Sequence, residues 1–137
     1  MFKTLFALTL ASALLAGCQS DPVMAPDAGL GDLLPIQDYP QIVVTSGLAP
    51  YLAFSRPNVQ GGPDRPMSVS IPVRVLSEDQ AVNTQFRFRF FDQNGRVMQP
   101  EMGFQYKRLP ARVQEFYNGA ALDTNAVDFR LEVRTAR

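Results

Sequence analysis

Histidine and tryptophan are absent from this chain of 137 residues, and cysteine occurs only once. The lack of histidine removes the commonest general base and the commonest metal ligand. A single cysteine cannot form an intramolecular disulfide, so an exported domain of this sequence must be stabilised by its core alone. Thirteen basic side chains balance thirteen acidic ones, so we expect no nucleic-acid partner.

The sequence also lacks the motifs of enzymes and metal proteins. It contains no Ser/His/Asp or Cys/His set, no glycine-rich phosphate loop and no cysteine cluster. The fragment from Asp92 to Gly95 resembles part of a calcium loop, but no bidentate glutamate follows at the required spacing. Asn94-Gly95 is instead the strongest short signal for a hairpin turn. Catalysis would rest on carboxylates alone, and we expect no enzyme, no cofactor and no metal site.

Residues 1–17 have the pattern of a signal peptide. Lys3 gives a short basic start, and the apolar run from Leu5 to Leu15 is too short for a membrane-spanning helix, which needs about 20 residues. The run ends in Leu15-Ala16-Gly17-Cys18, which resembles the lipobox of bacterial lipoproteins. Small residues fit an extended backbone into a peptidase, and only a thiol forms the thioether to diacylglycerol. We predict lipidation of Cys18; the alternative is an ordinary secretory signal with a chance cysteine.

The residue after the cysteine bears on localisation. In the lipoprotein sorting of enterobacteria, an aspartate at this position tends to retain the protein in the inner membrane. Gln19 therefore indicates, by resemblance, the periplasmic face of the outer membrane. Each buried methylene contributes about 0.8 kcal/mol, so several acyl chains on Cys18 would make the anchorage effectively permanent.

Residues 18–40 differ in composition from the rest of the chain. They carry four aspartates and no lysine or arginine, and their prolines forbid a continuous helix and interrupt a strand. We predict a lipidated cysteine followed by a flexible tether with a reach of about 25 Å. The alternative is that the apolar residues of this stretch dock on the domain or on a partner; they are Leu30, Leu33, Leu34 and Ile36.

Residues 41–137 alternate apolar and polar side chains with a period of two, which predicts strands. We expect strands at 42–44, 51–59, 67–75, 86–91, 104–109, 113–117 and 128–134. Their number and spacing favour an all-β fold, an immunoglobulin-like antiparallel β-sandwich of about seven strands. Pro57 interrupts the second strand, and Pro72 indicates an edge strand or a bulge. Phe86, Phe88 and Phe90 are expected in the core.

Two segments carry a resemblance to a known family. The stretch Gln-Phe-Arg-Phe-Arg-Phe-Phe-Asp-Gln-Asn-Gly at 85–95 resembles the "YRFxWFDxxG" signature of the YcfL-like periplasmic lipoproteins. The segment 125–134 resembles the closing strand of that family. Phe91 departs from the pattern, because a tryptophan is more typical nearby. The resemblance implies an immunoglobulin-like lipoprotein with no established catalytic activity, associated with envelope biogenesis near activators of peptidoglycan synthesis.

Arginine supplies 11 of the 13 basic residues, and the outward positions of the predicted strands hold candidate binding residues. These are Arg74, Arg87, Arg89, Arg130 and Arg134, joined by the aromatic Phe91. If 86–91 and 128–134 share a sheet, their arginines form a stripe on one face. The planar guanidinium suits carboxylates and phosphates, and an exposed aromatic among arginines is typical of interface hot spots. The alternative is a solvated face whose arginines pair with Glu132, Asp128 or Asp92.

These features together predict an outer-membrane-anchored lipoprotein that acts without catalysis, as a binding or scaffolding module in cell-envelope assembly. A link to peptidoglycan synthesis is the finer expectation, and the expected partner is an envelope protein with an anionic face. One alternative is a sandwich lipoprotein of the type VI secretion kind, which recruits a membrane component. The other is a direct binder of peptidoglycan or lipopolysaccharide, with a platform among Tyr51, Tyr106, Tyr117 and Phe91.

Overall fold

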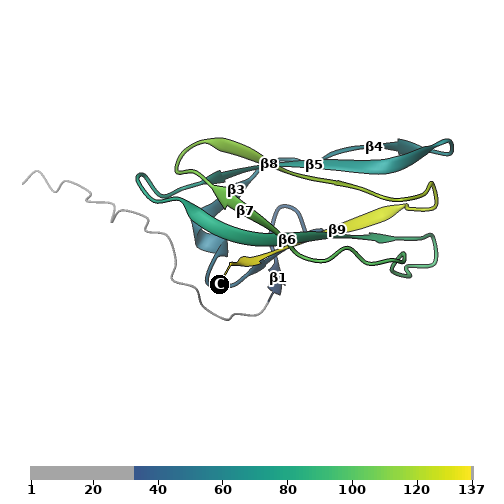
Figure 1. Cartoon of the computed structure of the whole chain (residues 1–137), viewed down its shortest axis with the longest axis horizontal. Helices are drawn as coiled ribbons and strands as arrows, with labels where there is room; N and C mark the ends of the chain where they lie inside the picture. The colour runs from purple at the N-terminus through teal and green to yellow at the C-terminus, as the bar shows by residue number, and fades with distance from the viewer. Residues whose placement is uncertain (1–32, 137) are drawn as a thin grey trace, which may run out of the picture.

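The computed structural model describes residues 33–136, which form two β-sheets packed face to face (Figure 1). The five-stranded sheet has the order β1 (Leu33–Pro35), β2 (Ile42–Thr45), β9 (Asp128–Thr135), β6 (Val82–Phe91) and β7 (Gln105–Leu109). The four-stranded sheet is centred on β5 (Arg65–Val75), with β8 (Gln114–Ala120) on one side and β3 (Leu52–Phe54) and β4 (Asn58–Gly62) on the other. A 3-10 turn, η1 (Ala49–Tyr51), precedes β3. The predicted all-β sandwich is confirmed.

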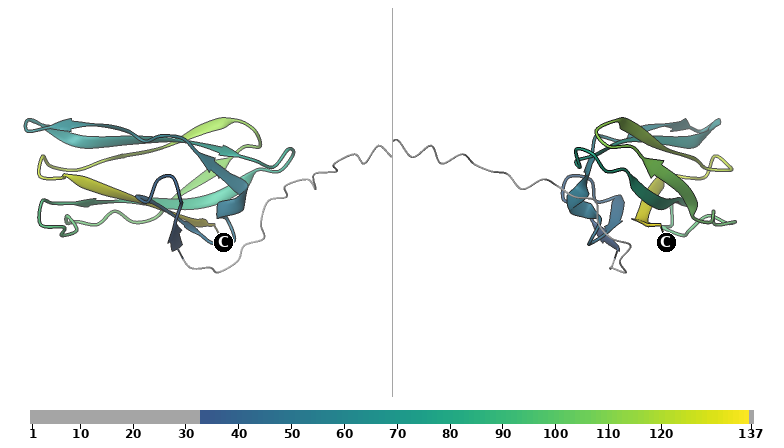
Figure 2. Two further views of the ribbon diagram at one scale, coloured as in Figure 1. Left: turned by 180° about the vertical axis from the view of Figure 1, so that it is seen from behind. Right: turned by 60° about the vertical axis from the view of Figure 1, so that its left-hand side comes forward.

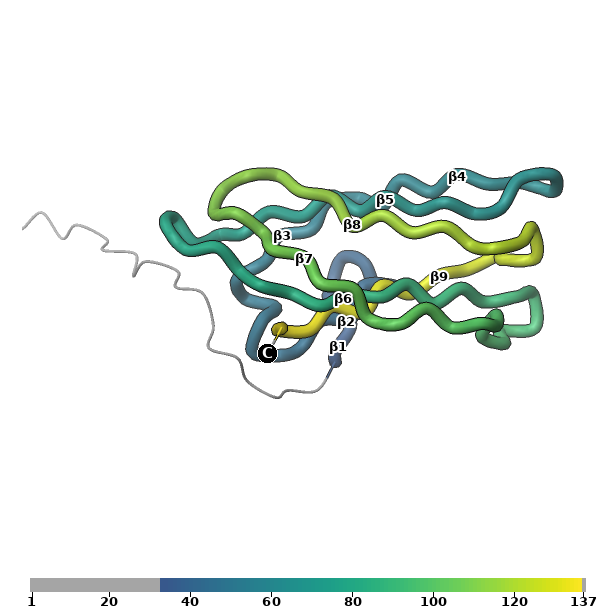
Figure 3. The backbone as a smooth tube through the Cα atoms, in the orientation of Figure 1, coloured from purple at the N-terminus to yellow at the C-terminus, as the bar shows by residue number. Residues whose placement is uncertain are grey.

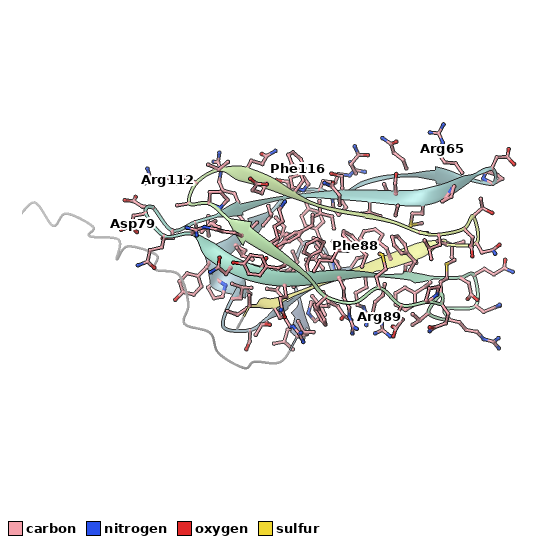
Figure 4. All side chains as sticks on the ribbon, viewed as in Figure 1. Arg65, Asp79, Phe88, Arg89, Arg112 and Phe116 are labelled. Carbon is pink, nitrogen blue, oxygen red and sulfur yellow. The ribbon has the colours of Figure 1, made fainter. Side chains whose placement is uncertain are left out.

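Alternation of side chains builds the core between the sheets. Phe86, Phe88 and Phe90 of β6 point inward and are 7%, 2% and 6% exposed, as predicted. Figure 4 shows Phe88 between the two layers, whereas its neighbour Arg89 lies outside the five-stranded layer. Burial of each such side chain stabilises the fold by about 1.5–3 kcal/mol. Valines and isoleucine of β5 face these rings from the other sheet; they are Val69, Ile71, Val73 and Val75.

Pro72 lies in a central strand, so its assignment to an edge or a bulge is wrong. The backbone N–H of Ser55 donates to the carbonyl of Pro72 at 3.0 Å, so the backbone of Pro72 faces the β3 and β4 side. There the pairing lapses between Phe54 and Asn58, around Pro57. The proline is tolerated because its missing donor falls at this break in the ladder. Figure 3 shows β3 and β4 following one another along the four-stranded layer.

The folded part begins earlier than the predicted boundary at residue 40. β1 pairs with β2, and the side chain of Ile36 packs on the core. The alternative of docking is therefore correct for Ile36, whereas the side chains of Leu33 and Leu34 stay 38% and 53% exposed although their backbone pairs with β2. β2 in turn runs parallel to β9, whereas the other paired strands are antiparallel within the described residues. The two layers and the protruding β4–β5 hairpin are seen from behind in Figure 2.

The predicted leader, the lipidation site at Cys18, the sorting residue Gln19 and Leu30 lie outside the described residues. Among residues 33–136, no helix is long and apolar enough to span a bilayer.

Candidate functional site

The predicted arginines of two strands share one face. β6 and β9 are neighbours, and their register places Arg87 opposite Glu132, Arg89 opposite Arg130 and Gln85 opposite Arg134. Because the phenylalanines of β6 point into the core, these residues point outward. The strands 86–91 and 128–134 therefore share a sheet, and their arginines form the predicted stripe. We call this surface the arginine face; it comprises Gln85, Arg87, Arg89, Phe91, Phe104, Arg130, Glu132 and Arg134.

Arg74 does not belong to the arginine face. It lies on β5 in the four-stranded sheet, paired with Ala53 and Gln114. Since Val73 and Val75 fill the core, Arg74 points away from the sandwich on the opposite side. The prediction that grouped Arg74 with the other four arginines is therefore wrong. Only the sheet topology reveals this, because it places β5 in the other sheet.

Glu132 is the centre of the arginine face. Arg87 Nε lies 2.5 Å from Glu132 Oε2, and Arg89 Nη1 lies 3.4 Å from Glu132 Oε1. The two guanidinium groups cover the carboxylate, and its side chain is only 5% exposed. A buried carboxylate requires such partners, because its desolvation is costly otherwise. The predicted cross-strand pairing with Glu132 is thus confirmed for Arg87 and Arg89. Both guanidinium groups already have a carboxylate partner within the protein.

The segment between β6 and β7 completes this arrangement. Glu101 accepts a hydrogen bond from Arg89 Nε at 2.7 Å. The Phe104 ring lies beneath two arginines, with its centre 4.6 Å from Arg87 Cζ and 3.7 Å from Arg134 Cζ. Neither residue was predicted as part of the site. Glu101 lies in a stretch without a periodic pattern, and Phe104 was expected only as the first residue of the strand 104–109, whereas β7 begins at Gln105.

Arg130 and Arg134 remain available to a ligand. Both are exposed, and no described carboxylate lies within ion-pair distance of either guanidinium. Arg134 Nε donates to Gln85 Oε1 at 2.9 Å while its guanidinium lies over Phe104. Arg130 lies over the Phe91 ring, 5.6 Å from its centre. The two arginines are four positions apart on one strand, a distance of about 13 Å. Aromatic rings thus support two guanidinium groups whose remaining donors point to solvent.

The other two predicted acidic partners bind backbone instead. Asp92 Oδ1 accepts the N–H groups of Asn94 and Arg96, at 2.8 and 3.0 Å. With Gly95 at a φ of +74°, this confirms the predicted turn. Asp128 Oδ1 accepts its neighbour's N–H. A hollow of about 610 Å³ lies at this end of the face, lined in part by Phe91, Asp92, Asp128 and Arg130.

Tyr117 is unsuitable as an aromatic platform. It is fully buried, and its hydroxyl lies 2.8 Å from the hydroxyl of Thr84. Burial raises the pKa of Tyr117 well above its ordinary value, and the hydrogen bond to Thr84 opposes that shift. Tyr106 is 61% exposed. Among the described residues, no group of three histidine, cysteine or acidic side chains is placed to hold a metal ion.

Most of the folded part of the chain, residues 42–135, matches a known family model. This range, from the start of β2 to the end of β9, matches the family model described as "Protein of unknown function (DUF1425)". The chain belongs to the DUF1425 family. The match covers both sheets apart from β1. No curated protein matches the sequence.

Two solved structures resemble this DUF1425 member. Campylobacter jejuni cj0090 is 21% identical with a TM-score of 0.56, over 70% of this chain and 98% of that one. A DUF1425 family member from Shewanella sp. pv-4 is 18% identical with a TM-score of 0.54, over 63% of this chain and 79% of that one. At these identities the likeness shows the fold, and the arginine face must be interpreted from its own chemistry.

Proposed function

We propose that this DUF1425 protein is a lipid-anchored, non-enzymatic binding module of the cell envelope that holds an acidic protein partner on its arginine face. The observation that carries the proposal is the state of Arg130 and Arg134. Both are exposed, supported by an aromatic ring and without a carboxylate partner among residues 33–136. Such guanidinium groups are pre-organised for bidentate contacts with carboxylates.

The surroundings of the two arginines favour a protein over a polyanion. Arg130 shares its hollow with Asp92 and Asp128, and these carboxylates would repel a dense array of phosphates. An acidic protein surface can instead place single carboxylates about 13 Å apart, matching the spacing along β9. The partly exposed Phe91 ring, which lies against Arg130, would add apolar contact beside that arginine, as aromatic residues do at interface hot spots.

The anchorage is proposed from the leader. Lipidation at Cys18 and the neighbouring Gln19 favour the periplasmic side of the outer membrane. Fifteen positions separate Cys18 from Leu33, the first described residue. A chain of this length spans at most about 50 Å, so a partner on the arginine face would be held close to the membrane.

The resemblance to YcfL-like lipoproteins supports the finer proposal, a role in envelope assembly linked to peptidoglycan synthesis. It rests on the segments 85–95 and 125–134. These segments correspond to β6 with its turn and to β9, the two strands that carry the arginine face.

A crosslinking pull-down of the full chain from native envelopes tests the proposal. We expect one abundant partner with an acidic surface, captured less as salt concentration rises. An Arg130→Gln, Arg134→Gln double variant should lose it, whereas Arg74→Gln on the opposite sheet should retain it. Retention by the double variant would refute the assignment of the face. Capture of an inner-membrane secretion component would support the type VI alternative, and retention on isolated sacculi that the double variant loses would support direct glycan binding at the arginine face.

A further inference from the structure

The outer face of the four-stranded sheet differs chemically from the arginine face. Two rows of uncharged side chains, polar except for Ala120, cross β4, β5 and β8 in register. One row consists of Asn58, Ser70 and Asn118, and the next consists of Gln60, Ser68 and Ala120. They point outward because the alternate residues of β5, such as Val69 and Ile71, are buried.

These side chains, together with Val69 and Gly119, line a shallow, open hollow of about 470 Å³. No charged residue contributes to its lining. None of the hydrogen bonds within residues 33–136 uses the three amides or the two hydroxyls of this hollow. Each carboxamide therefore offers two donors and one acceptor to solvent, and each hydroxyl offers both functions.

An apolar platform borders the polar rows. The next row along β5 and β8 pairs Pro72 with Phe116, and Phe116 is 41% exposed. Figure 4 shows Phe116 on the four-stranded layer, across the sandwich from Arg89. Adjacent outward positions of a strand lie about 7 Å apart. The ring is thus one row away from Ser70 and Asn118, close enough to share a ligand with them.

We infer that this surface, which we call the amide face, binds a neutral glycan chain. Sugar hydroxyl and N-acetyl groups need paired donors and acceptors without net charge, which carboxamides and hydroxyls supply. The C–H side of a pyranose ring is apolar and weakly positive, and it packs on the negative face of an aromatic ring such as Phe116. An anionic ligand finds no cation in the hollow, and an apolar peptide would leave five polar side chains desolvated and unpaired.

Glycan binding at the amide face would leave the arginine face free. The two faces lie on opposite sides of the sandwich (Figure 2). One molecule could then hold an acidic protein on one side and a polysaccharide on the other, a bridge that the proposed function alone does not include.

Titration of the full chain with short N-acetylglucosamine oligomers, followed by calorimetry and by NMR of side-chain amides, tests the inference. We expect saturable binding that shifts the signals of Asn58, Gln60 and Asn118. Asn118→Ala and Phe116→Ala should each weaken binding about tenfold. The matched control is Asn83→Ala, an exposed asparagine on β6 of the other sheet, which should bind as the wild type does.

Three outcomes would overturn the inference. The first is no binding to these oligomers at any solubility-limited concentration. The second is binding that Asn118→Ala and Phe116→Ala leave unchanged. The third is binding that the Arg130→Gln, Arg134→Gln double variant abolishes, because the ligand would then occupy the arginine face. Unfolding midpoints of each variant separate loss of the site from loss of the fold.

Discussion

Gly119 of β8 lies directly against the ring of Phe88 of β6, across the space between the two sheets. A Cβ atom built on Gly119 would approach Phe88 Cδ2 to 2.4 Å and Cγ to 2.5 Å. Phe88 is 2% exposed and packs on Phe90 and Phe129. These neighbouring rings restrict how far Phe88 can move, and the spacing of the sheets at this point depends on the absence of a side chain at residue 119.

Replacement of Gly119 by alanine should consequently destabilise the protein. Overpacking of a close-packed core costs about 1–3 kcal/mol, and we expect a loss in this range in the free energy of unfolding by urea. Gly103→Ala is the matched control, since a Cβ there meets no atom within 4 Å. Equal stability of the two variants would show that the sheets separate easily at this contact.

The buried carboxylate of Glu132 gives a second prediction. Glu132→Gln leaves Arg87 and Arg89 without their shared charge partner, and both are only about a quarter exposed, at 27% and 25%. Discounting for this exposure, we expect a loss of about 1–3 kcal/mol. Glu101→Gln removes a carboxylate that is 34% exposed and should cost under about 1 kcal/mol. A reversed order in thermal melts would contradict the central position of Glu132.

Tyr117 predicts a loss of stability at alkaline pH. Its pKa in the folded protein is raised by burial, whereas in the unfolded chain it titrates near about 10. The unfolded state therefore loses this proton first. The contribution of Tyr117 is complete below about pH 10 and declines as pH rises further, by about 1.4 kcal/mol per pH unit.

Chemical unfolding measured over a series of alkaline pH values checks this prediction. Tyr117→Phe should be less stable at neutral pH, because it loses the contact with Thr84, but should lack this decline. Tyr106→Phe, at an exposed tyrosine, should keep it. An equal decline in Tyr117→Phe and the wild type would assign the alkaline sensitivity to other groups.

The proposed anchor predicts a change in fractionation. Cys18→Ser removes the thiol that forms the thioether, so an uncleaved or unlipidated precursor should accumulate. Mass spectrometry of the N-terminus together with membrane fractionation measures this. Normal membrane attachment and processing of the variant would refute the lipobox.

The sorting residue is tested separately in an enterobacterial host. Gln19→Asp should shift the protein toward the inner membrane, measured by density-gradient separation of the two membranes. Gln19→Asn keeps a neutral amide and serves as the control. An unchanged distribution of Gln19→Asp would remove the basis for the outer-membrane proposal.

The sequence predicted the strands that bury one face in the core, because their side chains alternate between apolar and polar. Phe86, Phe88 and Phe90 alternate with polar residues because one face of β6 is core. The prediction of an edge strand or a bulge at Pro72 was wrong, because a proline can occupy this central strand only where the pairing breaks between β3 and β4. Leu33 was assigned to a tether since so short a strand has almost no periodicity of its own.

The arginine face was only half predictable. Alternation placed Arg87 and Arg89 outward, but it could not reveal that their carboxylate is nearly inaccessible or that Glu101 completes the network. Those contacts come from an irregular segment returning over the sheet, which depends on tertiary structure. The amide face was not predicted either, because asparagine, glutamine and serine at outward strand positions are ordinary until the register aligns them in rows.

The parallel pairing of β2 with β9 has a mechanical consequence. A pull on the N-terminal chain reaches β1 first, then β2, and only then the strand that carries Arg130 and Arg134. Tension between that chain and a partner held on β9 would therefore cross two successive ladders of backbone hydrogen bonds within one sheet. The three-residue β1 would detach before the buried β2, so under load the domain would lengthen at its edge while the arginine face kept its geometry.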